Sequence, residues 1–144
     1  MDPCCFDTTP TRVGWDGSAL DPLRPVAEAR CRARVWVRER WQLPELVDSV
    51  ELAVGELCAN AVRHGGGLAG LELVLGRGGR RFAPPSLRVV VVDREPGRVP
   101  RLPLSSDPLG ESGRGLWLVE AVSRRWGWHR AGCGEKSVWC TFAV

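Results

Sequence analysis

The decisive stretch of this sequence is Glu56-Leu57-Cys58-Ala59-Asn60-Ala61-Val62-Arg63-His64-Gly65. Its polar residues Glu56, Asn60 and His64 are spaced by four, so they lie above one another on one face of a helix. Apolar residues form a neighbouring stripe that would bury this helix against a flat partner such as a sheet, at Val50, Val54, Leu57 and Ala61. Spacing alone favours an exposed polar flank over a ligand site, and only a second motif can change that.

Sequence signals mark both ends of this helix. Asp48 with Glu51 three residues later resembles a capping box, and Gly65-Gly66-Gly67 ends the helix because glycine can adopt the left-handed conformation. A separate amphipathic helix is predicted from Pro25 to about Trp41, before the break at Leu43-Pro44. Its apolar positions recur at helical spacing, at Val26, Ala29, Ala33, Val37 and Trp41.

Strand-like runs follow the second helix. Leu71 to Leu75 and Leu87 to Asp93 are predicted to form an antiparallel hairpin joined by a long glycine-, arginine- and proline-rich loop, 76–85. The continuous valines of the second run predict a central strand. Later elements are a third helix from Gly113 to about Arg125 and two strands, Trp126 to Arg130 and Ser137 to Val144, joined by a turn at Gly132 and Gly134.

This order of elements predicts one α/β (α+β) domain, a two-layer sandwich with about three helices on one face of a mixed, mainly antiparallel sheet. We expect residues 1–20 to form an irregular or edge-strand lead-in and residues 21–144 to form the domain. A chain of 144 residues can bury a single core without metals or disulfides.

Composition narrows the function classes. The chain has no apolar run near the roughly 20 residues needed to cross a bilayer, and its start lacks the features of a signal peptide, so we expect a cytoplasmic protein. The net charge of +3 without a basic stripe argues against direct nucleic-acid binding. The six cysteines are scattered, which is typical of reduced, mostly buried thiols rather than of a disulfide framework.

A second motif precedes the third helix. The stretch Gly110-Glu111-Ser112-Gly113-Arg114-Gly115-Leu116 places three glycines and an arginine directly before it. Free backbone N–H groups at a helix N-terminus bind phosphate, and glycine lets phosphate oxygens approach the chain. The proline-rich residues 94–112 are too long for a passive connection, so we expect a functional loop or lid.

Together these motifs resemble the ATP-binding domains shared by gyrase-type ATPases and histidine kinases (the Bergerat fold), and within them the anti-sigma-factor serine kinases. The resemblance covers about residues 25–144. It rests on the N-box from Glu56 to Gly65, an acidic strand end at Asp93 with Gly97, and a glycine box from Gly113 to Leu116.

The resemblance implies roles for the N-box and the strand end. Asn60 would coordinate the magnesium ion that bridges the phosphates of ATP. Glu56 would be the general base that takes a proton from an attacking serine hydroxyl. Asp93 would accept a hydrogen bond from the adenine amino group, and Gly97 would keep the wall beside the base thin.

The remaining implied residues belong to the glycine box and the last strand. Gly113, Arg114, Gly115 and Leu116 would surround the phosphates. Ser137 would face the adenine through water, although an exposed strand serine is an equally good interpretation. The partner implied is an anti-anti-sigma-type protein, a sigma factor or both, and the family suggests a homodimer.

One departure keeps two alternatives open. The family's acidic strand end usually continues as Asp-x-Gly-x-Gly, whereas this chain reads Asp93-Arg94-Glu95-Pro96-Gly97 and lacks the first glycine. A stiffer, more charged loop favours a non-catalytic module that sequesters a partner protein. Nucleotide hydrolysis that drives a gyrase-type clamp is a third hypothesis, but it needs an additional domain.

Overall fold

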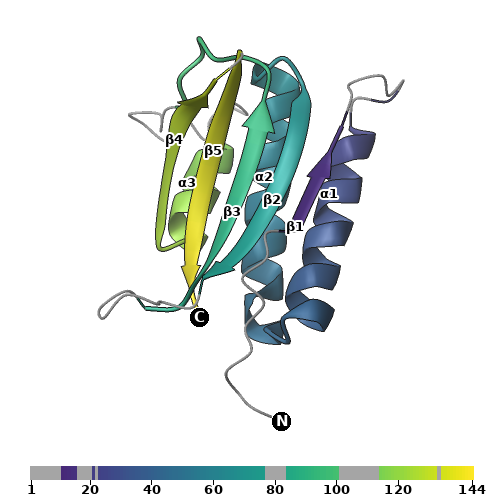
Figure 1. The fold of residues 1–144 in the computed structure, drawn as a ribbon, viewed down its shortest axis with the longest axis vertical. Helices are drawn as coiled ribbons and strands as arrows, with labels where there is room; N and C mark the ends of the chain where they lie inside the picture. The colour runs from purple at the N-terminus through teal and green to yellow at the C-terminus, as the bar shows by residue number, and fades with distance from the viewer. Residues whose placement is uncertain (1–10, 16–20, 22, 77–83, 101–113, 133) are drawn as a thin grey trace.

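The computed structural model describes residues 11–15, 21, 23–76, 84–100, 114–132 and 134–144, and it has a sheet with helices layered against it (Figure 1). In chain order the elements are β1 (Thr11–Gly14), α1 (Arg24–Val35), α2 (Val47–His64), β2 (Leu68–Gly76), β3 (Ser86–Asp93), α3 (Arg114–Val122), β4 (Arg125–Ala131) and β5 (Glu135–Ala143). In Figure 1, α2 and α3 lie behind the sheet and α1 lies beside its β1 edge. The predicted two-layer α/β sandwich is confirmed.

The sheet has the strand order β1-β2-β3-β5-β4. All four pairings among the described strands are antiparallel, which corrects the expectation of a mixed sheet. Both predicted hairpins, β2 with β3 and β4 with β5, are present, because neither connection is long enough for the crossover that a parallel pair needs. The valine run belongs to β3, which is the middle strand of the sheet, as predicted. Thr11–Gly14 forms an edge strand.

The two predicted apolar stripes face the core. Ala29, Ala33 and Val37 of the first stripe are fully buried, and a five-residue π-helical turn, Trp36–Arg40, extends α1 to Trp41. All four residues of the stripe on α2, Val50, Val54, Leu57 and Ala61, are at most 2% exposed. Among the described residues, no helix combines the length and apolar character needed to span a membrane.

The capping box predicted at Asp48 and Glu51 is not formed. Leu46 occupies the N-cap position of α2 without a side-chain hydrogen bond, and Asp48 lies within the first turn. The reason is a 3-10 turn, Pro44–Leu46, that leads directly into the helix. The Val47 amide donates to the Pro44 carbonyl of this turn, so the first N–H group of the helix is satisfied without a side-chain cap.

The third helix is shorter than predicted. It ends at Val122, where the Ser123 amide makes the last helical bond to the Val119 carbonyl at 2.9 Å and the Ser123 hydroxyl donates to the same carbonyl at 2.6 Å. The Arg124 amide then donates to the Thr141 carbonyl at 2.8 Å, so Arg125 begins β4 instead of continuing the helix. Residues 101–113 of the expected lid and glycine box lie outside the described residues.

The reactivity of the cysteines tests the packing of the hydrophobic core. Burial raises the pKa of Cys58 and of Cys140 to about 12, whereas Cys31 is exposed on α1. At pH 8 only about one buried thiol in ten thousand would be ionised, and the thiolate is the reactive form. We expect iodoacetamide to label Cys31 in the folded protein and to label Cys58 and Cys140 only after unfolding, as read by peptide mass spectrometry. Equal labelling of the three sites would contradict the packing.

Candidate functional site

The polar stripe of α2 meets the start of α3 at Gly115. A Cβ atom placed on Gly115 would lie 2.6 Å from Oε2 of Glu56 and 3.5 Å from Nδ2 of Asn60. Glu56 and Asn60 are both partly buried, and Gly115 is buried. The structure therefore brings the N-box and the described part of the glycine box into direct contact, and only glycine fits between them without moving Glu56.

The stripe continues to His64, the last residue of α2. Partial burial lowers the pKa of His64, and the positive charges of Arg98 and Arg63 lower it further. A histidine whose pKa falls below its usual value is neutral at pH 7. The formal positive charge near this end of the stripe therefore comes from arginines.

Asp93 ends the central strand and is buried. Its carboxylate Oδ2 lies 3.3 Å from the Lys136 ammonium, and both side chains are about 5% exposed. Its Oδ1 accepts a hydrogen bond from the Glu95 amide at 3.0 Å. Burial raises the pKa of Asp93, while the Glu95 amide and the Lys136 charge oppose that shift.

Gly65 places the end of α2 against Asp93. A Cβ atom on Gly65 would lie 2.6 Å from Cγ and Oδ2 of Asp93, and the Gly65 carbonyl accepts the Arg94 amide at 2.8 Å. Gly66 and Gly67 have φ values of 67° and 116°, which confirms the predicted left-handed helix end. The backbone at the end of α2 therefore packs directly against the Asp93 side chain at the end of β3.

The remaining predicted site residues differ in their placement. Arg114 is exposed at the start of α3, whereas Leu116 is 5% exposed and belongs to the core. Gly97 is exposed, and its amide donates to Oε1 of Glu95 at 3.0 Å. Gly113 lies outside the described residues.

Ser137 is not brought together with Asp93. In the ladder between β3 and β5, Lys136 pairs with Asp93 and Ser137 pairs with Val92. Side chains alternate between the two faces of a sheet, so Lys136 shares the helix-covered face with Asp93, and Ser137 lies on the opposite face. The position beside the acidic strand end belongs to Lys136.

Lys136 is therefore the site residue that the sequence analysis missed. It is 3% exposed and is the only lysine among the twenty basic residues of the chain. The available signal was a single lysine directly before a predicted strand, in a chain whose other positively charged residues are arginines. Lysine is rarely fully buried without a charged partner, so a buried lysine here would indicate a nearby carboxylate.

Gly65→Ala tests the contact between α2 and Asp93. The new methyl group overlaps a buried carboxylate that Lys136 holds in place, so we expect a loss of about 1–3 kcal/mol in the free energy of unfolding, measured with urea. The matched control is Gly132→Ala, where an added Cβ meets no atom within 4 Å. Equal urea midpoints for the two variants would rule out the tight contact.

Comparison with known families agrees with this geometry. Residues 21–142 match the sequence model of the histidine kinase-like ATPase domain. No curated protein matches the chain closely enough to count as a relative. The family match spans most of the chain and includes α2, the central strand and α3. The chain therefore belongs to the histidine kinase-like ATPase domain family.

Proposed function

We propose that this protein is an ATP-dependent regulatory protein with serine/threonine kinase activity on an anti-anti-sigma-type partner. The observation that carries the proposal is the contact of Gly115 with Glu56 and Asn60, which joins a carboxylate, an amide and a helix N-terminus in one place. Membership of an ATPase domain family supports ATP as the nucleotide.

The residues at this contact fit a nucleotide triphosphate. Gly115 lets Glu56 and Asn60 lie against the start of α3, where backbone N–H groups and the helix dipole favour phosphate. Asn60 offers an amide oxygen of the kind that magnesium accepts, and Arg114 supplies positive charge at the same helix end. Magnesium would neutralise phosphate charge during the transfer.

Glu56 would serve as the general base. It would take the proton from a serine hydroxyl of the partner while that oxygen forms its bond to the γ-phosphorus, and the bond between the γ-phosphorus and the bridging oxygen breaks to release ADP. The Glu56 side chain is only partly buried, and its carboxylate lies against the start of α3.

Replacement of the proposed base tests this assignment. Glu56→Gln keeps the size of the side chain but cannot accept the proton, so phosphate transfer should fall by about 10²- to 10⁴-fold while Mg-ATP affinity is retained. The measurement is transfer of labelled γ-phosphate to anti-anti-sigma-type proteins of the same organism. Glu45→Gln, on an exposed glutamate outside the site, is the control. Unchanged transfer by Glu56→Gln would refute the role of Glu56.

Gly115→Ala tests the geometry instead of the chemistry. The added Cβ displaces the flexible end of Glu56, whereas alanine is well tolerated in a helix, so the fold should be retained. A misplaced base of this kind costs roughly a hundredfold in transfer rate. Gly132→Ala should leave both the rate and the stability unchanged. The proposed site geometry fails if Gly115→Ala transfers phosphate at the wild-type rate.

One observation favours a second function, a non-catalytic module that sequesters a sigma factor or another regulatory protein. Both oxygens of Asp93 already have partners within the protein, Lys136 and the Glu95 amide. Calorimetric titration with Mg-ATP separates the two functions, because heat of binding below millimolar nucleotide supports the kinase and its absence supports the module. Cytoplasmic location and homodimer formation are parts of the same proposal.

A further inference from the structure

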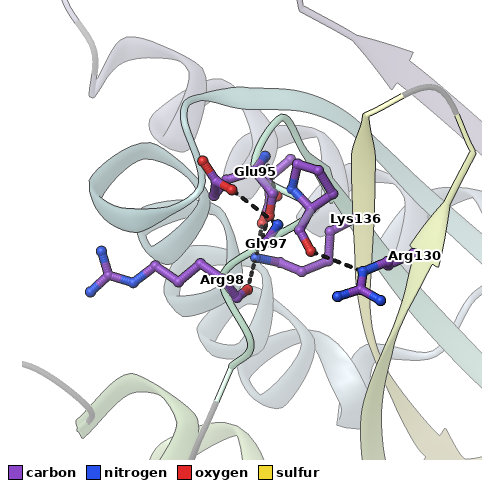
Figure 2. A network of polar contacts seen from close by, with 7 residues as sticks. Glu95, Gly97, Arg98, Arg130 and Lys136 are labelled. Atoms are coloured by element: carbon purple, nitrogen blue, oxygen red, sulfur yellow. Dashed lines mark hydrogen bonds and ion pairs between the residues drawn. The ribbon is translucent and has the colours of Figure 1, made fainter.

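Lys136 uses its ammonium group to hold the segment that follows β3. Its Nζ donates to the Arg98 carbonyl at 2.5 Å and to the Glu95 carbonyl at 3.0 Å, and it lies 3.3 Å from Oδ2 of Asp93. Figure 2 shows the lysine reaching from β5 toward Glu95 and Arg98. An ammonium group has three donors, so all of them are used inside the protein.

The same segment is held by further contacts. The Glu95 side chain accepts the Gly97 amide at 3.0 Å, and the Arg130 guanidinium of β4 donates to the Pro96 carbonyl at 3.3 Å (Figure 2). Contacts within the protein therefore hold residues 93–98, which we name the base wall. Lys136 is the central tie, because it contacts both the start and the end of the base wall.

Asp93 keeps a free capacity to accept hydrogen bonds. An ionised carboxylate has about four lone-pair positions, and the Glu95 amide and Lys136 occupy two of them. The two partners also fix the orientation of the carboxylate, and with it the directions of the remaining lone pairs. Such a carboxylate can accept a hydrogen from an exocyclic amino group but cannot pair with a carbonyl oxygen.

We propose that Lys136 is a positioning residue for the nucleotide base: by fixing the Asp93 carboxylate and the base wall before nucleotide arrives, it makes the site select a base with an exocyclic amino group. This proposal rests on the proposed ATP binding. A preformed wall avoids the ordering cost that a glycine-rich loop incurs on binding.

The charge of Lys136 also makes this selectivity less dependent on pH, because it keeps the Asp93 carboxylate ionised. The charged groups that face Asp93 from neighbouring elements are Lys136 on β5 and Glu95 in the base wall, whereas α2 presents Gly65. Burial and the Glu95 charge raise the pKa of Asp93, and Lys136 lowers it. Removal of Lys136 therefore raises the pKa of Asp93 further, so protonation weakens the acceptor at low pH and deprotonation restores it at higher pH.

The test compares ATP with inosine triphosphate, which carries a carbonyl oxygen in place of the amino group, by calorimetry at pH 6 and pH 8. Wild type should prefer ATP by roughly tenfold or more at both pH values, as expected for one hydrogen bond to a charged acceptor. Lys136→Met should lose the preference at pH 6 and regain part of it at pH 8. General damage to the fold would weaken both nucleotides equally and leave the preference intact.

Hydrogen exchange supplies a readout that needs no nucleotide. The amides of Glu95 and Gly97 should exchange at least roughly tenfold faster in Lys136→Met than in wild type, because the base wall loses its central tie. Arg30→Met removes a basic partner from a surface ion pair with Glu51 and should change neither amide. If Lys136→Met does not fold, Lys136→Gln is measured instead, since its amide can still donate to a wall carbonyl.

The outcomes separate the two proposals. Wild type that binds neither nucleotide at millimolar concentration overturns ATP binding and, with it, the role of Lys136. Wild type that prefers ATP, together with a lysine variant that keeps the same preference at pH 6, overturns only the role of Lys136. Unchanged exchange of the Glu95 and Gly97 amides in the variant has the same consequence.

Discussion

The ion pair between Asp93 and Lys136 is the constraint on which the organisation of the site depends. It joins the end of β3 to the start of β5 under the end of α2, and it leaves no room for a side chain at Gly65. A buried ion pair of this kind contributes little net stability, but loss of one partner leaves the other charge buried and unpaired. Its effect is therefore positional: it determines where the chain turns after the central strand.

A second constraint is the close approach of α2 and α3. Gly115 has Glu56 and Asn60 directly against it, so the helix that carries the polar stripe and the helix that begins at the glycine box are held at a short separation. Most helix contacts are filled by side chains. Here the absence of a side chain lets two polar groups lie directly against the start of α3.

These two constraints lie on the helix-covered face of one sheet, which explains how distant segments share a site. Asp93 and Lys136 reach that face by strand alternation, and the stripe of α2 reaches it because the neighbouring apolar stripe packs on the sheet. Arg130 then holds the base wall from outside the core, and Glu95 braces it from within. The site is thus assembled from elements that the core had already placed.

The sequence by itself determined the helices, the hairpins, the central strand and the position of Glu56 and Asn60 on one face of α2, because these follow from periodicity, glycine positions and local spacing. It did not determine the start of α2, where a 3-10 turn replaced the capping box at Asp48. Nor did it place Lys136 rather than Ser137 beside Asp93, because a shift of one residue in strand register exchanges the faces of the sheet. That choice is made only by pairing with β3, a contact between segments more than 40 residues apart.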